Sequence, residues 1–260
     1  MGSQSWLNVL IICLIAIIGA THAELQLGFY AKSCPKAEKI VLKYVHEHIP
    51  NAPSLAAALI RLHFHDCFVR GGPYWNVPTG RRDGLISKAA DVFLGLPAPF
   101  HNLTTLLTLF GNVGLDATDL VLLSGAHTIG IGHCASVSNR LYNFTGKGDQ
   151  DPDLDSKYAK TLKTFKCKSI NDQTTALEMD PGSRNTFDLG YYKQVVKRRG
   201  LFQSDVALLK SSTTRSIVAQ QLQSPEKFFV EFAKSMEKMG RINVKIGTEG
   251  EIRKHCAFVN

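Results

Sequence analysis

One short segment of the chain combines side chains that could move protons. Arg61 and His65 stand four residues apart, so on a helix they share one face, with Phe64 beside them. Histidine transfers protons near neutral pH, and a guanidinium one turn away stabilises negative charge that develops on a bound oxygen. The spacing therefore predicts a proton acceptor beside an electrostatic clamp. The alternative is an ordinary helix on which both residues are incidental.

His63 and His65 also raise the question of a metal site. Positions i and i+2 of a helix point to different faces, so both rings reach one ion only where the segment is extended. Because the surrounding residues favour a helix, the pattern argues against a zinc site here.

A second segment, LLSGAHTIG at residues 122–130, places His127 at the end of an apolar run. A histidine in this position is either a hydrogen-bonded residue of the core or a ligand of haem iron. An iron ligand needs an acceptor for its other ring nitrogen. Asp205, in the segment GLFQSD, is a candidate that spacing alone does not prove.

Helices must position these residues, because the hydrophobic periodicity is mainly helical and β signals are few. Apolar spacing and capping residues predict helices over 35–48, 55–68, 104–110, 119–124 and 224–240. Gly, Pro and Asn cluster over 71–100, which predicts a loop. The expected fold class is all-α.

The N-terminus has the features of a secretory signal peptide. Residues 1–23 contain no Asp, Glu, Lys or Arg, and 6–20 form a nearly continuous apolar run. We expect a signal peptide over 1–23 and a mature domain over 24–260 that is secreted to the cell wall or, alternatively, reaches the vacuole. No membrane anchor is expected. Asn102 and Asn143 lie in Asn-X-Thr sequons, which fit glycosylation along that route.

The net charge limits the kinds of binding partner to expect, and the cysteine count limits the possible disulfides. The formal net charge of +8 at pH 7 fits attraction to an acidic cell-wall polysaccharide, or only a soluble surface, and nucleic acid is not an expected partner of a secreted chain. Cys13 lies in the signal peptide, which leaves five cysteines in the mature chain. An odd number in a secreted protein predicts a free thiol or a link between chains.

Together these motifs closely resemble the secretory plant haem peroxidases, the class III family. The matching segments are RLHFHDCF (61–68), LSGAHTIG (123–130), FY and SCP (29–35), GRRDG (80–84), LPAPF (96–100), MGRI (239–242) and GTEGEIR (247–253). The resemblance covers nearly the whole mature chain. It implies an all-α haem peroxidase fold, with haem b between a distal and a proximal half. It also implies a monomeric enzyme that oxidises small phenolic donors with hydrogen peroxide.

The resemblance assigns roles to the residues named above. His65 would be the distal acid–base residue, Arg61 would stabilise the transition state of O–O cleavage, and Phe64 would shield the haem edge. His127 would be the axial ligand of the haem iron, and Asp205 would orient it.

It also implies a calcium site, a donor channel and a disulfide. Four side chains match the proximal calcium site: Thr128, Asp180, Ser183 and Asp188. A backbone carbonyl near Thr186 would complete that shell of hard oxygen ligands. Pro97 would line the channel of the aromatic donor, and Cys134 would pair with Cys167.

One departure from the family lies at the join of Gly71 and Gly72. The family places several dozen residues there, so the sequence predicts that an internal block is missing and that the distal half is incomplete. The block would carry the Asn that accepts the Nδ1 proton of His65 and the acidic partner of Arg81. It would also carry most distal calcium ligands, of which Asp66, Val69 and Gly71 remain, too few for calcium.

The missing block also removes the family partners of three cysteines: Cys34, Cys67 and Cys256. Cys34 and Cys256 could pair by default, or these thiols could link chains.

The sequence leaves two candidate functions. The first is a secreted haem peroxidase; the second is a truncated, non-enzymatic relative, haem-free or acting as a basic wall-binding glycoprotein. Haem retention distinguishes them.

Overall fold

The computed structural model describes residues 25–55, 77–86, 96–255 and 258–260. The expected signal peptide therefore lies outside the described residues, as does the predicted helix over 55–68. The same holds for all sequence-predicted distal residues: Arg61, Phe64, His65, Asp66, Val69 and Gly71.

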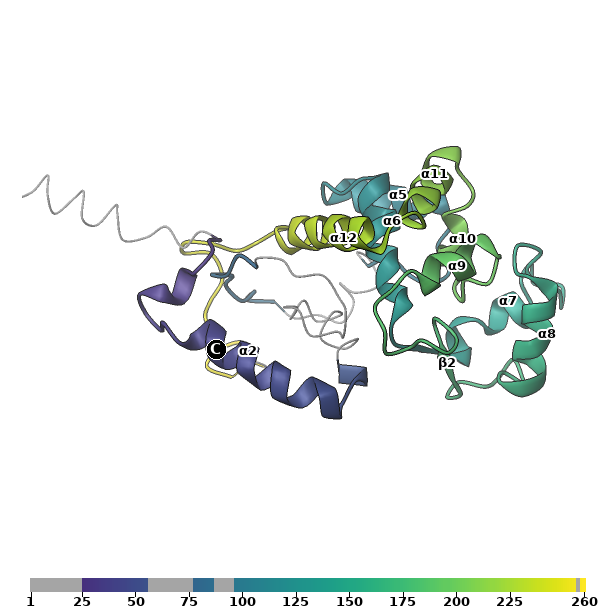
Figure 1. Ribbon diagram of the computed structural model, residues 1–260, viewed down its shortest axis with the longest axis horizontal. Coiled ribbons are helices and arrows are strands. Elements are labelled where there is room, and N and C mark those ends of the chain that lie inside the picture. Colours follow the sequence, from purple (N-terminus) through teal and green to yellow (C-terminus); the bar gives the residue numbers. More distant parts are fainter. Residues whose placement is uncertain (1–24, 56–76, 87–95, 256–257) are drawn as a thin grey trace, which may run out of the picture.

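The described chain is mainly helical (Figure 1), as the sequence predicts. The helices are α2 (Ala37–His48), α5 (Leu103–Asn112), α6 (Ala117–Ser124), α7 (Ser138–Tyr142), α8 (Ser156–Phe165), α9 (Gly190–Val196), α10 (Gln203–Ala207), α11 (Ser212–Gln221) and α12 (Pro225–Gly240). Short 3-10 turns are η1 (Phe29–Ala31), η2 (Ile49–Asn51), η3 (Gly125–Thr128) and η4 (Cys134–Ser136). The four predicted helices within the described ranges are confirmed, each within three residues at either end.

The sequence missed α7 to α11 and a small antiparallel sheet. In that sheet β1 (Ile131–His133) pairs with β2 (Ala176–Glu178), with Gly132 opposite Leu177. Helix α11 is rich in polar residues, so hydrophobic periodicity marks it poorly, whereas α8 has a clear apolar stripe that the prediction missed. Side-chain caps also mark the starts of both helices, because Asp155 accepts from the Tyr158 amide and Ser211 accepts from the Thr213 amide.

The main core forms where α12 and α6 pack together with α5, α9 and α11. Helix α12 starts at Ser224, whose hydroxyl accepts from the Lys227 amide, and Pro225 occupies its first turn. Its apolar stripe buries Phe228 and Phe232 completely, and Phe187 stacks on Phe228 with ring centroids 5.3 Å apart. This core fixes α6 and the η3 turn that follows it.

A second core surrounds the disulfide of Cys134 and Cys167, which the structure contains as expected. Both cysteines are fully buried, among Val137, Leu141 and Leu162. A bridge that closes a loop of this kind contributes about 2–4 kcal/mol to stability.

The GRRDG loop packs against the segment after α12. Asp83 and Glu251 exchange two backbone hydrogen bonds, and Arg82 donates to the Glu249 carbonyl at 2.7 Å. The Arg81 guanidinium donates to the backbone carbonyls of Gly240 and Pro78. Backbone carbonyls thus accept the hydrogen bonds of Arg81, whose acidic partner the sequence predicts to be missing.

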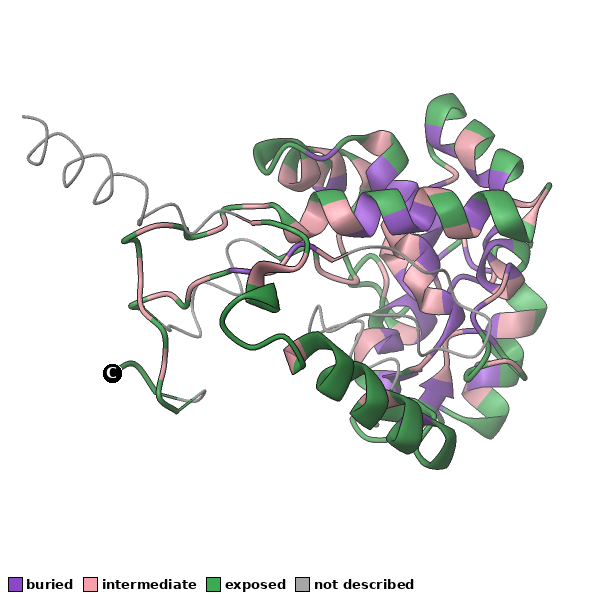
Figure 2. Ribbon diagram, turned by 60° about the vertical axis from the view of Figure 1, so that its left-hand side comes forward, coloured by how far each residue is buried: buried purple, intermediate pink, exposed green. Residues whose placement is uncertain are grey.

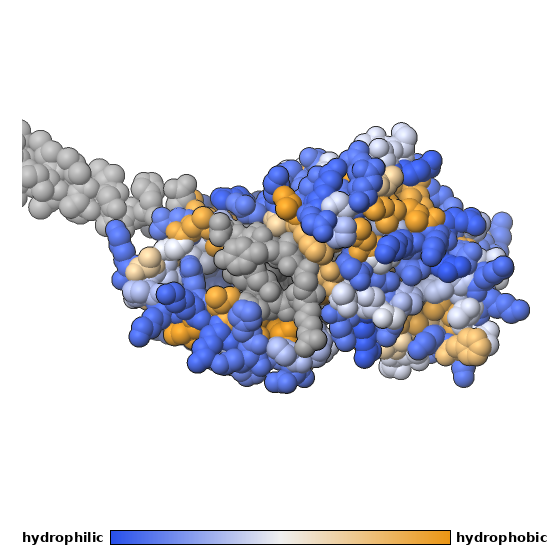
Figure 3. Space-filling view, in the orientation of Figure 1, coloured by the Kyte–Doolittle hydropathy of each residue, from blue (hydrophilic) through white to orange (hydrophobic). Residues whose placement is uncertain are grey.

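The surface of helix α2 is almost entirely exposed (Figures 1 and 2), although Val45 near its end packs against the main core. The helical spacing of Ile40, Val41 and Tyr44 is that of a face that packs, yet these side chains are 60%, 59% and 59% exposed. Figure 3 shows hydrophobic side chains at the surface in this region. Before α2, Cys34 is an exposed free thiol. Cys67 and Cys256, its possible partners, lie outside the described residues.

Within the described ranges, no single helix is long and apolar enough to cross a membrane. The α5 helix and the segment Ala117–Thr128 reach the required length and composition only together, with a bend of 107° between them. Both contribute side chains to the main core.

Candidate functional site

His127 lies in the η3 turn directly after α6. Helix α6 begins with a capping box, in which Asp116 accepts from the Asp119 amide and Asp119 accepts from the Asp116 amide. At the start of η3, a Cβ on Gly125 would lie 2.6 Å from the Tyr192 hydroxyl. Only glycine lets the turn approach the aromatic core this closely, and this approach positions the His127 ring.

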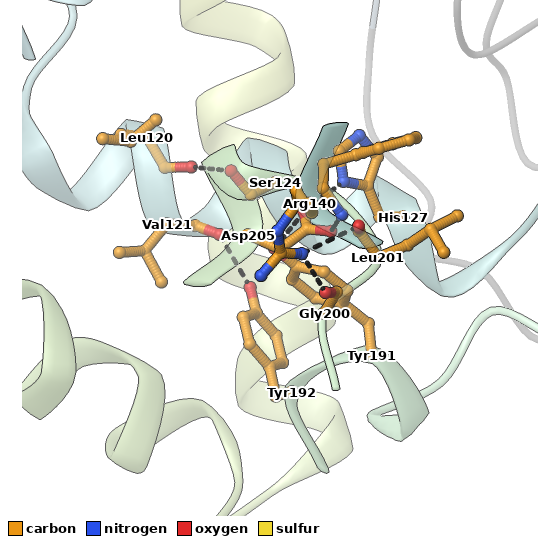
Figure 4. A network of polar contacts seen from close by, with 11 residues as sticks. Leu120, Val121, Ser124, His127, Arg140, Tyr191, Tyr192, Gly200, Leu201 and Asp205 are labelled. Carbon is orange, nitrogen blue, oxygen red and sulfur yellow. Dashed lines mark hydrogen bonds and ion pairs between the residues drawn. The ribbon is translucent and has the colours of Figure 1, made fainter. Parts of the chain in front are cut away.

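The structure pairs His127 with Asp205, which the sequence left open (Figure 4). His127 Nδ1 lies 2.8 Å from Asp205 Oδ1, and the carboxylate is buried. Because an ionised carboxylate only accepts hydrogen bonds, Nδ1 carries the proton and donates it to Asp205. The lone pair of neutral His127 is thereby placed on Nε2, the form in which histidine binds a metal.

His127 faces a large cavity, and 31% of its side-chain surface is exposed. The cavity has a volume of about 1020 Å³. Its lining is mainly apolar and includes Pro97, Leu106, Phe110, Leu123, Met179 and Phe202. An apolar cavity of this size, with Nε2 of His127 at its wall, fits a haem.

Pro97, for which the resemblance implies a place in a donor channel, lines this cavity. Its segment lies against α10, because the Ser204 amide donates to the Pro99 carbonyl at 3.0 Å. The segment that carries Pro97 is therefore connected to the helix that carries Asp205.

A buried ion pair that the sequence did not reveal supports the backbone before α10. Arg140 Nε lies 2.7 Å from Asp151 Oδ2, and both side chains are 1% exposed. Arg140 Nη1 also donates to the carbonyls of Gly200 and Leu201, each at 2.8 Å (Figure 4). The pair thus holds the turn from which Asp205 reaches His127.

The four expected calcium ligands come together beside η3. Asp188 accepts from the Thr128 hydroxyl at 3.2 Å and from the Ser183 hydroxyl at 3.0 Å. Asp180 is buried, and its Oδ2 has no hydrogen-bond partner. Burial and the nearby Asp188 carboxylate raise the pKa of Asp180 to about 6.

This arrangement fits calcium. Its carboxylate and hydroxyl oxygens are hard donors, and a cation would neutralise the repulsion between Asp180 and Asp188. Among the described residues, no three His, Cys, Asp or Glu side chains form a metal-binding group. Hydroxyl and carbonyl oxygens would then supply part of a calcium shell.

We expect calcium to stabilise the chain more at pH 7 than at pH 5. Without calcium, the raised pKa of Asp180 gives stability that is full below about pH 4 and is lost as the pH rises through about 6. At pH 7, calcium at about 100 times its Kd should add about 2.7 kcal/mol to the free energy of unfolding. Denaturant unfolding with calcium or with chelator, at both pH values, measures this difference.

The control for this prediction is Asp180→Asn, which keeps the shape but removes the charge. It should abolish both the calcium effect and its pH dependence. Equal calcium stabilisation at pH 5 and pH 7 in the unaltered chain would contradict the assignment of Asp180 as a ligand.

Comparison with known proteins gives a consistent match. A family model described as Peroxidase matches residues 69–224, more than half of the chain. Peroxidase 3 of Arabidopsis thaliana is 51% identical over 311 aligned positions, which cover 95% of each chain. Peroxidase 39 of Arabidopsis thaliana is 49% identical, with 97% of this chain and 98% of the relative covered. Peroxidase 1 of Oryza sativa subsp. japonica is 39% identical over the full length of both chains.

The lengths of these alignments are informative. The alignment with Peroxidase 3 spans 311 positions, whereas this chain has 260 residues, so at least 51 of those positions hold no residue of this chain. The relatives thus contain residues that have no counterpart here.

Proposed function

The chain belongs to the peroxidase family, among the class III plant peroxidases, and we propose that it binds haem b at His127 and uses hydrogen peroxide to oxidise small phenolic donors. The family is one of oxidoreductases with the all-α haem peroxidase fold. The observation that carries the proposal is the hydrogen bond from His127 to buried Asp205 at the wall of the apolar cavity.

The described residues support this chemistry from the proximal side. Haem, when bound, supplies the redox-active iron. Asp205 holds the proton on Nδ1 of His127, so that Nε2 stays available for the metal, and it makes the imidazole more basic. The apolar walls of the cavity would pack against the haem. Pro97 borders the path along which an aromatic donor would reach the haem edge.

On the distal side, the resemblance assigns proton transfer to His65, charge stabilisation to Arg61 and shielding to Phe64. We propose that His65 takes a proton from peroxide and returns it to the leaving oxygen. The missing block at Gly71 and Gly72 would remove the acceptor that orients the His65 ring. A histidine without this acceptor is a poorer base, so we expect a slow enzyme.

Metal content and location are part of the same proposal. We expect one bound calcium ion, at the proximal residues, because Asp66, Val69 and Gly71 are too few to hold a second one. Secretion to the cell wall agrees with the exposed sequons at Asn102 and Asn143. The charge of +8 favours retention on acidic wall polysaccharide, and we expect a monomer.

Peroxide-dependent oxidation of a phenolic donor tests the proposal. The chain, refolded with haem and calcium, should oxidise guaiacol at a rate above that of free haem at the same concentration. His65→Ala should lower this excess, but by less than the roughly 10²–10⁴-fold that a well-oriented acid–base residue contributes, because His65 lacks its orienting acceptor here. A rate equal to that of free haem, unaffected by His65→Ala, would favour the non-enzymatic alternative.

A further inference from the structure

Asp205 accepts a hydrogen bond that its pairing with His127 does not require. The Tyr191 hydroxyl donates to Asp205 Oδ1 at 3.0 Å, and His127 Nδ1 donates to the same oxygen at 2.8 Å (Figure 4). The Tyr191 side chain is 1% exposed, and its ring meets the His127 ring edge-on, with centroids 5.7 Å apart. Neither the sequence motifs nor the family resemblance pointed to this residue.

The other carboxylate oxygen is held by the backbone. Asp205 Oδ2 accepts from the Phe202 amide at 2.7 Å, which fixes the plane of the carboxylate at the start of α10. Among the described residues, Tyr191 is therefore the only side chain besides His127 that donates to Asp205. Its effect can be removed by mutation without breaking the backbone contact.

Two donors that share one oxygen compete for its negative charge. A hydrogen bond from a hydroxyl stabilises the carboxylate and makes it a weaker acceptor for the second donor. Removing the hydroxyl should strengthen the bond from His127, and the imidazole should gain anionic character. Burial and the Asp205 charge raise the pKa of Tyr191 well above its usual value, so its hydroxyl stays protonated at physiological pH.

We propose that Tyr191 is a positioning residue, whose hydrogen bond to Asp205 limits how strongly the carboxylate polarises His127 and thereby sets the electron donation of His127 to the haem iron. The claim about electron donation to the haem iron rests on the proposed function. The claim that Tyr191 limits the polarisation of His127 by Asp205 does not require haem.

Tyr192 provides a matched control. It is adjacent in sequence, fully buried, and donates its hydroxyl hydrogen bond to the Val121 carbonyl at 3.0 Å rather than to Asp205. Tyr191→Phe and Tyr192→Phe each remove one buried hydroxyl and its donated hydrogen bond. Their costs in stability should be similar, about 1 kcal/mol each, while only Tyr191→Phe changes the acceptor of His127.

The test is proton NMR of the haem-free chain with ¹⁵N-labelled histidine. The Nδ1 proton of His127 should move downfield in Tyr191→Phe, because its hydrogen bond to Asp205 shortens, and should stay in place in Tyr192→Phe. Site-specific 3-fluorotyrosine at position 191 keeps the shape and is a stronger donor, so it should shift the same proton upfield. An unchanged proton in both position-191 variants, or an equal shift in Tyr192→Phe, would overturn the proposal.

A second readout applies to the haem-loaded chain. Resonance Raman spectra of the reduced form should show a higher iron–histidine stretching frequency in Tyr191→Phe than in the unaltered chain or in Tyr192→Phe. A frequency that is the same in all three would overturn the claim about electron donation. If the chain takes up no haem, the proposed function fails, whereas the NMR experiment still decides the role of Tyr191.

Discussion

Replacing Arg140 with methionine is expected to lower the free energy of unfolding by about 3–5 kcal/mol. The substitution leaves Asp151, 1% exposed, as an unpaired buried charge. It also removes the donor to the Gly200 and Leu201 carbonyls, which hold the backbone before Asp205. Urea denaturation of both chains, followed by circular dichroism, measures the loss.

Arg241→Met is the matched control for this prediction. Arg241 pairs with Glu237 one turn away on the surface, where both side chains are largely exposed, so its loss should cost under about 1 kcal/mol. Adding Asp151→Leu to Arg140→Met should recover part of the stability, because it removes the unpaired charge. Equal losses for Arg140→Met and Arg241→Met would contradict a structural role for the buried pair.

Inserting the block that the sequence predicts to be missing between Gly71 and Gly72 should have the largest effect on activity. We expect the corresponding segment of a relative such as Peroxidase 3, placed at this join, to raise the rate of phenol oxidation about 10²–10⁴-fold, since it would supply the acceptor that makes His65 an effective base. The insertion should also cover the apolar face of α2, where Ile40 and Tyr44 are exposed. Steady-state kinetics with guaiacol and peroxide measure the gain.

The control carries the same insertion together with His65→Ala. If the inserted residues act through His65, this variant should gain no activity while its stability rises like that of the insertion alone. An insertion that improves stability but leaves the rate unchanged would contradict the account of the distal site. It would also show that the direct connection of Gly71 to Gly72 does not lower the catalytic rate of this chain.

The sequence predicted α12 and three other periodic helices, and most of the helices that it missed are short or mainly polar. Helix α12 was predictable because Phe228 and Phe232 repeat at helical spacing between a Ser-Pro start and a terminal glycine. Helix α11 was not, since its residues are mostly polar and its start depends on the Ser211 cap. The apolar face of α2 was predicted as well, yet most of it is exposed in the structure. Periodicity shows that a helix has an apolar face, but it does not show which element packs against that face.

The candidate site was predictable only in part, because local patterns do not show contacts between residues that are distant in the sequence. Periodicity and motif singled out His127 and Asp205, yet 78 residues separate them, and only the folded chain brings them together. Arg140 and Tyr191 carry no local signal, because their importance comes from burial against Asp151 and Asp205. The resemblance supplied the calcium ligands, and the structure adds the reason they fit, an unpartnered oxygen on buried Asp180.

The central claim is that His127, held by Asp205, binds the iron of a haem in the apolar cavity. A haem titration of the refolded chain with calcium, followed by absorbance and compared with His127→Ala, tests it most directly. The account predicts saturable uptake at one haem per chain, with a Soret band of histidine-ligated haem that peroxide alters and that His127→Ala lacks. Uptake that does not saturate, or identical spectra for both chains, would contradict it.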